Sequence, residues 1–386
     1  MIKIVTIIGA RPQIIKAAAI SRAIKKYFFK EITEIIVHTG QHYDERMSAI
    51  FFEELSIPKP DYNLNVGSSN HGIQTAQMIK GIEEILLKEK PDYIILYGDT
   101  NSTLAGAIAA SKINIPIVHI EAGLRSYNKA MPEEINRIMC DHVSTLLFSP
   151  TKTGFNNLLK EGFKENKSPY NIDNPGIYHC GDIMYDNSLY FSEIAEKKSG
   201  ILTKYQLKQN EFILGTIHRN NNTDDPKRLN AIFTAINKIS ESERITIVLP
   251  LHPRTNKVLQ DNLDRETYIK TINNHLIKII PPVSFLDMIL LEKNSEMIIT
   301  DSGGVQKEAF FFQKPCIIIR SESEWVEIID CGLGIIADAD ESRIYKAFKH
   351  FKEIKLPHYN AIFGKGNAAE FICNEMITQS KNKKVK

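Results

Sequence analysis

The sequence has few cysteines, no excess of charge of one sign and no long apolar run. The five cysteines, Cys140, Cys180, Cys316, Cys331 and Cys373, are widely spaced and form no Cys-X-X-Cys pair. This usage excludes a disulfide framework and is typical of reduced packing residues in a cytoplasmic protein. No His, Cys and Asp spacing matches a metal site, so we expect no bound metal.

The balance of charge and the short apolar runs argue against nucleic acid and membrane partners. Lys plus Arg number 48 and Asp plus Glu 46, a formal net charge of only +2. Proteins that bind nucleic acid usually carry a stronger positive field. No stretch reaches the roughly 18 apolar residues that a membrane span needs. The apolar run near the N-terminus is too short for a signal peptide, and no small-residue cleavage site follows it.

Short β-branched runs alternate with amphipathic stretches along the 386 residues. This length suits two to three domains of about 150 residues. Nearly all-apolar strands that alternate with helices predict parallel βαβ units. Strands are expected at Lys3–Ile8, Ile35–His38, Tyr93–Tyr97, Ile117–Ile120, Phe212–Ile217, Ile245–Leu249, Leu276–Ile280, Met297–Thr300 and Cys316–Ile319, and helices at Pro12–Lys26, at Ile73–Leu87 and from near Ser102.

A change of composition marks the predicted boundary between two halves. Around Glu165–Tyr178 the chain is rich in Asn, Pro, Ser and Lys, which predicts a loop, and the alternation restarts after Gly200. We therefore expect two doubly wound, Rossmann-like α/β domains that face a central cleft, over residues 1–180 and 181–362, followed by residues 363–386 with a basic tail. In such sheets ligands bind at the carboxyl ends of the strands.

The first predicted strand is followed by Gly9-Ala10-Arg11-Pro12-Gln13-Ile14-Ile15-Lys16. Gly9 permits a tight turn, and Pro12 suits the first turn of a helix. Arg11 would lie beside the helix N-terminus, which favours an anion, with Lys16 one turn further on. The segment is either a diphosphate site or an ordinary strand–helix turn with two solvated cations. No GxGxxG motif or P-loop follows the strand, so a dinucleotide is not expected.

A second candidate anion site follows Met297–Thr300. There Ser302, Gly303 and Gly304 open a predicted helix, and Glu308 lies further along it, where it could accept ribose hydroxyls. The alternative is an N-capped helix with a Gly-rich turn. Two anion sites, one in each half, would hold a nucleotide diphosphate.

Acidic and histidine side chains follow other strand ends. Asp99, Glu121 and Glu133 could each be a simple helix cap or first-turn acid, but three at one sheet edge suggest acid–base chemistry. Glu134 follows Glu133 directly and should point elsewhere. Other candidates at strand ends are His218, His252, His38 and His42, and Arg125 and Arg137 could balance the acids.

Eight motifs occur in the order seen in one family, over residues 9 to about 370. The chain resembles the non-hydrolysing UDP-N-acetylglucosamine 2-epimerases. The resemblance implies a glycosyltransferase-B-like fold with a C-terminal helix that returns to the first domain, a homodimer, a UDP-sugar substrate and no cofactor. The motifs are Gly9–Lys16, His38–His42, Gly98–Ser102, His119–Ser126, Pro132–Arg137, His218-Arg219, Asp301–Glu308 and Gly364–Ala369.

The resemblance also assigns roles to single residues. It implies a catalytic set, a substrate-binding set around the diphosphate and ribose, and a segment that in some members binds a second, activating UDP-sugar. The catalytic set is Asp99, Glu121, Glu133 and His218; the substrate-binding set is Arg11, Lys16, Arg137, His252, Ser302, Gly303, Gly304 and Glu308; the activating segment contains Gln41 and His42.

Carbohydrate chemistry explains why such residues are needed. The proton on C2 of an acetamido sugar is not next to a carbonyl carbon, so its direct removal is very unfavourable. A carboxylate can remove it while UDP leaves C1, and UDP then re-adds as the opposite face of C2 is protonated. Two faces need at least two acid–base groups, and the sequence leaves open which carboxylate serves which face.

Two departures from the family pattern bear on the substrate. Asn221 stands where the family commonly has an acid, and Ser323–Glu327 lacks the common Arg-Pro pair. Together with Ala10-Arg11-Pro12-Gln13, they favour the branch that acts on UDP-2,3-diacetamido-2,3-dideoxyglucuronate. A hydrolysing epimerase, a UDP-sugar glycosyltransferase of the same fold and a non-catalytic UDP-sugar-binding module stay open as alternatives.

Overall fold

The computed structural model describes residues 1–40, 57–251, 253–357, 359 and 361–384. The chain divides into two compact units. The first comprises Met1–Asn187 together with Ala361–Lys386, and the second comprises Ser188–Asn360.

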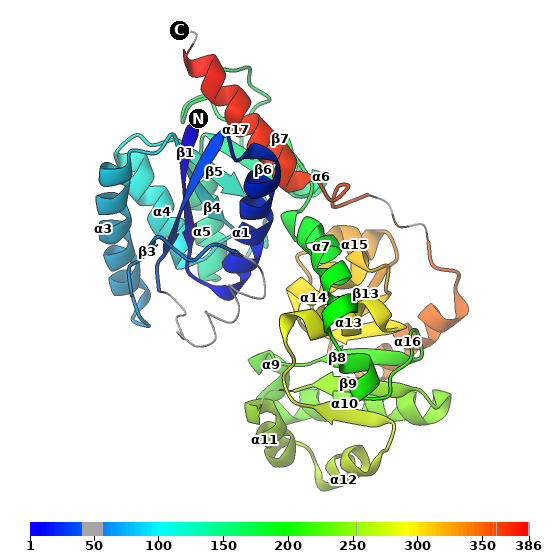
Figure 1. Cartoon of the computed structure of the whole chain (residues 1–386). Coiled ribbons are helices and arrows are strands. Elements are labelled where there is room, and N and C mark those ends of the chain that lie inside the picture. Colours follow the sequence, from blue (N-terminus) through cyan, green and yellow to red (C-terminus); the bar gives the residue numbers. More distant parts are fainter. Residues whose placement is uncertain (41–56, 252, 358, 360, 385–386) are drawn as a thin grey trace. The chain divides into compact units, whose positions relative to one another are not determined.

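The first unit is built on a seven-stranded parallel sheet in the order β3-β2-β1-β4-β5-β6-β7. Helices α3, α4 and α5 pack together on one face, and α1 and α17 pack together on the other (Figure 1). The strands are β1 Ile2–Ile8, β2 Ile32–His38, β3 Tyr62–Asn63, β4 Tyr93–Tyr97, β5 Ile117–Ile120, β6 Leu146–Ser149 and β7 Gly176–His179. The helices are α1 Arg11–Ala23, continued by a π-helical turn at Ile24–Phe28, α3 His71–Glu89, α4 Asn101–Lys112, α5 Pro132–His142, α6 Lys152–Lys160 and α17 Ala368–Lys384. Helix α7, Ile183–Lys198, begins in the first unit and crosses into the second after Asn187.

The second unit repeats this architecture with a six-stranded parallel sheet in the order β10-β9-β8-β11-β12-β13. This strand order is that of a dinucleotide-binding Rossmann sheet. The strands are β8 Phe212–Thr216, β9 Thr246–Pro250, β10 Ile277–Ile280, β11 Met297–Thr300, β12 Cys316–Ile318 and β13 Gly334–Ile336. The helices are α8 Ile201–Lys204, α9 Asn220–Thr223, α10 Pro226–Glu243, α11 Pro253–Asn262, α12 Arg265–Asn273, α13 Phe285–Asn294, α14 Gly303–Phe311, α15 Val326–Asp330 and α16 Glu341–Glu353.

Local sequence signals explain where these elements begin and what they bury. Thr100 caps α4 by accepting a hydrogen bond from the N–H of Thr103 at 3.4 Å. Met78, Ile82 and Leu86 recur at helical spacing along α3 and are fully buried against the sheet. Each such side chain contributes about 1.5–3 kcal/mol on burial, so packing rather than intrinsic propensity holds α3 in place.

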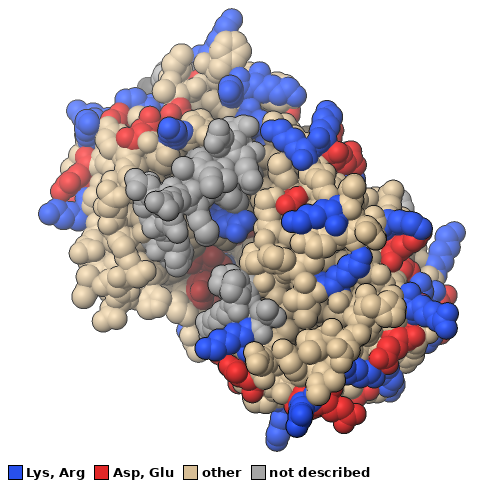
Figure 2. Space-filling model, turned by 60° about the horizontal axis from the view of Figure 1, so that its bottom comes forward, with Lys and Arg blue, Asp and Glu red and all other residues tan. Residues whose placement is uncertain are grey.

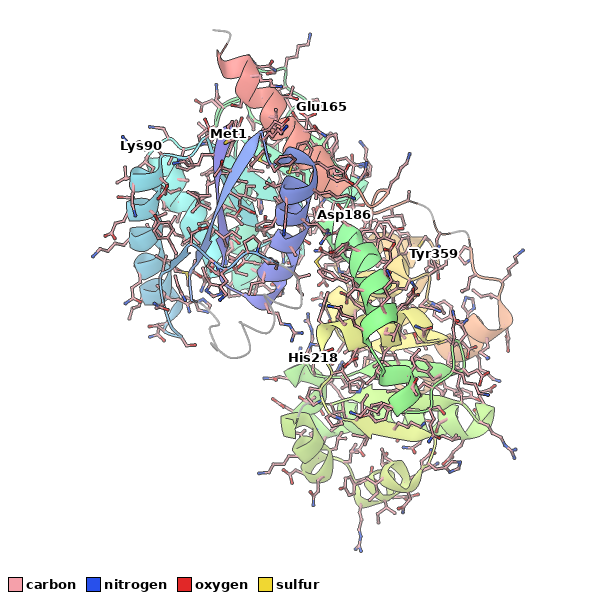
Figure 3. The ribbon with its side chains drawn as sticks, in the orientation of Figure 1. Met1, Lys90, Glu165, Asp186, His218 and Tyr359 are labelled. Carbon is pink, nitrogen blue, oxygen red and sulfur yellow. The ribbon has the colours of Figure 1, made fainter. Side chains whose placement is uncertain are left out.

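Helix α17 comes from the end of the chain and completes the first unit. The side chain of Phe371 packs edge-on against Phe148 and Tyr178. The carboxylate of Asp186, labelled on α7 in Figure 3, accepts the N–H groups of Ala368 at 3.2 Å and Ala369 at 2.8 Å. Burial raises the pKa of Asp186 to about 6, while these two hydrogen bonds oppose the rise.

The predicted fold class is confirmed, because both sheets are parallel, doubly wound and Rossmann-like. Tyr93–Tyr97, Ile117–Ile120 and Met297–Thr300 form strands with the predicted bounds. The expectation of a loop throughout Glu165–Tyr178 is wrong, since β7 begins at Gly176 and pairs with β6. An edge strand has one neighbour and one half-exposed side, so it does not need the continuous apolar run that marks a central strand.

The surface carries both signs of charge. On the face in Figure 2, Lys and Arg are interspersed with Asp and Glu without a continuous field of one sign. Among the described residues, no helix combines the length and the hydropathy that crossing a membrane requires.

Candidate active site

At the carboxyl edge of the first sheet, the side chain of Lys16 pairs with Glu121. The Glu121 side chain is 8% exposed and follows β5 directly, with a left-handed backbone at φ 71°. A non-glycine residue rarely adopts this conformation, and such strain is concentrated at functional sites. Gly98 lies against the pair, because a Cβ added there would meet Lys16 Nζ at 3.1 Å and Glu121 Oε2 at 3.3 Å.

Asp99 and Arg137 form a second pair at this edge. Arg137 donates from Nε to Asp99 Oδ2 at 2.9 Å and from Nη1 to Glu134 Oε2 at 2.6 Å. Glu134 is buried and also accepts the N–H groups of Ser126 at 3.0 Å and Tyr127 at 2.9 Å. Glu134 is therefore a structural carboxylate that orients Arg137 and closes the turn before α5.

Glu133, the residue before it, is exposed on the first turn of α5. Within the described part of the chain it makes no hydrogen bond or ion pair, so it is available to a ligand. Adjacent carboxylates on one helix have opposite environments here because consecutive helical residues point about 100° apart.

Gln13, which the sequence did not single out, organises the turn between β1 and α1. Its buried Oε1 accepts the N–H of Gly9 at 2.9 Å and of Ala10 at 3.2 Å, and its Nε2 donates to the Tyr97 carbonyl at 3.1 Å. Two N–H groups that could have held an anion are thus already used. Arg11 lies exposed at the first position of α1. A Gln three residues after a helix cap is a capping-box signal, and it could have revealed this role.

A chain of alternating charges, buried except for Glu161, also ends at this edge. His119 Nδ1 lies 2.7 Å from Asp141 Oδ1, and Arg125 Nη2 lies 2.7 Å from Asp141 Oδ2. Arg125 continues to Glu161 through two hydrogen bonds of 2.7 Å. The expectation that Arg125 balances acidic residues agrees with this geometry, although its partners are Asp141 and Glu161.

In the second unit, the fully buried Asp301 organises the end of β8. It accepts the N–H groups of His218 and Arg219, each at 3.1 Å, and the side-chain amide of Asn222 at 3.1 Å. The ring of His218, labelled in Figure 3, places Nδ1 3.0 Å from Asp301 Oδ1 and is 57% exposed. Burial alone would raise the pKa of Asp301, but His218 and these donors hold it below its usual value.

The N-terminus of α14 is capped and crowded. Ser302 accepts the N–H of Val305 at 3.4 Å, and a Cβ added to Gly303 would meet Glu324 Oε1 at 2.4 Å. Glu324 pairs with Arg320 at 2.9 Å. A carboxylate of the chain itself therefore lies against this helix N-terminus, which has the polarity that favours anions.

The other predicted binding residues of the second unit lie on α14, and Asn221 lies on α9. Gly304 is exposed and Glu308 is partly buried. Lys307 is buried, with Nζ 4.4 Å from the centre of the Trp325 ring. Asn221 is exposed, whereas the side-chain amide of Asn222 donates a hydrogen bond to Asp301.

Three predicted residues, His252, Gln41 and His42, lie outside the described residues. His38 is described and is fully buried; its Nδ1 accepts the N–H of Gly40 at 2.9 Å. Burial lowers the pKa of His38 to about 4. In the part of the chain that the structure describes, no group of three or more His, Cys, Asp or Glu side chains could hold a metal ion.

Comparisons with known proteins agree with the motif order. The family model for UDP-N-acetylglucosamine 2-epimerase matches residues 26–377. A Methanococcus maripaludis protein named UDP-N-acetylglucosamine 2-epimerase homolog is 48% identical over 368 residues, 95% of this chain and 97% of that protein. The Pseudomonas aeruginosa UDP-2,3-diacetamido-2,3-dideoxy-D-glucuronate 2-epimerase is 46% identical over 371 residues, 96% of this chain and 98% of that protein.

A solved structure is similar over nearly the same span. The Methanocaldococcus jannaschii UDP-GlcNAc 2-epimerase, crystallised in complex with UDP-GlcNAc and UDP, aligns with a TM-score of 0.82 and 42% identity. The alignment covers 97% of this chain and 99% of that one. Together with the ordered motifs and the two Rossmann-like sheets, these matches establish that the chain belongs to the UDP-N-acetylglucosamine 2-epimerase family.

Proposed function

We propose that this protein is an isomerase that inverts C2 of a UDP-2-acetamido sugar reversibly and without a cofactor. The observation that carries the proposal is the Lys16–Glu121 pair, a carboxylate in a left-handed backbone beside a cation at the end of β5. A general base held by a strained backbone and a fixed charge is pre-organised for proton transfer. Family membership gives this carboxylate its substrate class.

The reaction proceeds by elimination and re-addition. A carboxylate takes the C2 proton, the electron pair of that C–H bond forms the C1–C2 double bond, and the bond between C1 and the UDP oxygen breaks. UDP then attacks C1 while an acid protonates C2 on the other face. We assign Asp99, Glu121, Glu133 and His218 to these proton transfers and to the reacting sugar.

Substrate binding belongs to the cationic and helix-terminal groups. Cations and helix N-termini stabilise the negative charge that develops on the departing diphosphate. On binding, the diphosphate would replace Glu324 at the start of α14, since both are anions at the same N-terminus. The proposed binding residues are Arg11, Lys16, Arg137, His252, Ser302, Gly303, Gly304 and Glu308, with Gln41 and His42 in a second, activating site.

For the sugar, we favour UDP-2,3-diacetamido-2,3-dideoxyglucuronate. Asn221 is exposed where the family pattern has an acid, so a uronate would meet no like charge there. The Pseudomonas relative named for this substrate is 46% identical. We also propose a homodimer and domain boundaries near residues 180 and 362, which sedimentation and limited proteolysis would test.

One incubation separates this proposal from its alternatives. UDP-N-acetylglucosamine and UDP-2,3-diacetamido-2,3-dideoxyglucuronate are each incubated with the protein in D2O, and the product is followed by NMR. We expect product with deuterium at C2, no net release of UDP, and a higher kcat/KM for the diacetamido-glucuronate. Free UDP would indicate a hydrolysing epimerase, no reaction without an acceptor would favour a glycosyltransferase or a binding module, and full protium at C2 would refute elimination.

A further inference from the structure

Hydrogen-bond geometry sets the charge of His119, which lies two residues before Glu121 and is fully buried. Its Nδ1 is 2.7 Å from a carboxylate oxygen of Asp141, and its Nε2 is 2.9 Å from the carbonyl oxygen of Gly98. An ionised carboxylate and a backbone carbonyl can only accept hydrogen bonds. Both ring nitrogens must therefore carry hydrogen, which makes His119 an imidazolium.

His38 has the same burial and the opposite charge state. It ends β2 in the same sheet, and the N–H of Gly40 donates to its Nδ1 at 2.9 Å. A nitrogen that accepts cannot carry hydrogen, so the ring of His38 is neutral. Burial alone therefore does not decide the charge of a histidine at this sheet edge; the groups that its nitrogens face decide it.

The charge of His119 is balanced within the first unit. Asp141 also receives Arg125 at 2.7 Å and the N–H of Gly123 at 3.1 Å, and Arg125 is held by Glu161. The three buried groups His119, Asp141 and Arg125 carry one net positive charge, which Glu161 at the surface balances, and buried charges are tolerated when they are paired in this way. The titratable groups that face the ring in the described part of the chain are Asp141 and Cys140. Burial would lower the pKa of His119, but these two groups raise it well above its usual value.

At the His119 end, this series of charged groups meets the turn at Gly98 and Asp99, where the proposed chemistry takes place. Gly98 has a left-handed backbone at φ 61°. Its Cα lies against the Lys16–Glu121 pair, since a Cβ added there would meet Lys16 Nζ and Glu121 Oε2. The next residue, Asp99, pairs with Arg137. A donor fixed on the Gly98 carbonyl therefore limits the rotation of the peptide unit between Gly98 and Asp99.

We propose that His119 is a positioning residue, a permanent imidazolium whose Nε2–H holds the Gly98 carbonyl and so places Asp99 and the Lys16–Glu121 pair. The proposal builds on the function proposed above, because it names a group that orients the catalytic carboxylates without touching the sugar. A misplacement of about 1 Å can cost about a hundredfold in rate.

Two substitutions of His119 separate positioning from packing. In His119→Gln the side-chain amide reaches the position of Nε2 and can still donate to Gly98. In His119→Asn the amide reaches only the position of Nδ1, so the donor to Gly98 is lost. Both variants remove the charge and make the side chain smaller. We expect kcat to fall about 10- to 100-fold in His119→Asn and clearly less in His119→Gln, with KM and UDP affinity within about twofold of wild type.

A spectroscopic measurement on the wild-type protein tests the charge without reference to activity. With ¹⁵N-labelled histidine, the ring nitrogens of His119, identified by their loss in either variant, should both carry hydrogen from pH 6 to 8.5, with a slowly exchanging Nε2–H. His38 in the same spectra should be neutral at pH 7. His350, exposed on α16, serves as the substitution control, and His350→Gln should turn over like wild type.

Each unfavourable result overturns a defined part of the proposal. A neutral His119 ring or a rapidly exchanging Nε2–H refutes the imidazolium clamp. If neither variant folds, backbone-to-ring correlations in the wild-type protein identify the His119 ring instead, so the measurement stays decisive. Equal kcat in the Asn and Gln variants refutes positioning. A wild-type protein that epimerises neither sugar refutes the proposed function and the positioning role with it, while the ring measurement still decides the charge.

Discussion

Burial of neutral His38 makes the stability of the protein fall as the pH falls below neutrality. The pKa of His38 is lowered from its ordinary 6.5 to about 4 by burial. The unfolded chain therefore binds a proton between pH 6.5 and 4 that the folded chain does not, and the free energy of unfolding decreases in this window as the pH drops. At about 1.36 kcal/mol per pH unit, the loss is about 2 kcal/mol at pH 5 and approaches about 3 kcal/mol below pH 4.

The substitution His38→Asn isolates this contribution. Its Oδ1 can accept the N–H of Gly40 as Nδ1 does, but it does not titrate. Urea unfolding of wild type and variant would be followed by far-UV circular dichroism at pH 7.5, 6.5, 5.5 and 5. Between pH 7.5 and pH 5, the free energy of unfolding of the wild type should fall by about 2 kcal/mol more than that of the variant.

Other groups titrate in the same range, so only the difference between proteins is informative. Asp186, with its pKa raised to about 6, acts in the opposite direction in both of them. The variant His350→Asn, at an exposed position of α16, supplies the matched control for replacing a histidine by asparagine. A difference for His38→Asn that does not change with pH would refute the neutral, buried state of His38.

Three further substitutions test other parts of the structure. Glu121→Gln should lower kcat by about 10²–10⁴-fold and change UDP affinity far less, as steady-state kinetics and calorimetry would measure; unchanged turnover would move the base elsewhere. Asp141→Asn leaves a net positive charge buried beside Arg125 and should cost about 3–5 kcal/mol of stability in urea unfolding, whereas a cost below 1 kcal/mol would contradict the buried charge chain. Gly9→Ala places a Cβ 2.1 Å from Ser102 Oγ and should lower the free energy of unfolding by about 1–3 kcal/mol. The control Gly67→Ala, whose Cβ meets no atom within 4 Å, should leave stability unchanged. Equal thermal stabilities of the two variants would refute the close packing at Gly9.

Most central strands could be predicted from sequence because their signal is local, although β6, Leu146–Ser149, was not among the expected strands. Tyr93–Tyr97 and Ile117–Ile120 are short apolar runs, and burial on both faces requires such runs. The position of site residues directly after strands follows from the same signal, so Asp99 and Glu121 could be proposed from the sequence. The edge strand at Gly176–His179 could not, because it is short and pairs on one side only.

The partners of the site residues could not be predicted from the sequence, because these contacts join residues that are far apart along the chain. Asp301 meets His218 across 83 positions of the chain, and His119 meets Asp141 across 22. A pattern along the chain does not say which carboxylate will be buried beside which cation. Glu134 was correctly expected to differ from Glu133, since that distinction is set by helical geometry alone.

The chain path of the first unit has a consequence for its synthesis. The second unit is continuous, so all of its residues have been made once Asn360 is added. The first unit lacks α17 until the last segment emerges, and with it the side chain of Phe371 and the N–H groups that satisfy Asp186. During translation, therefore, the second unit is complete before the first, and until α17 is made the first unit lacks the groups that cover Phe148 and satisfy the carboxylate of Asp186.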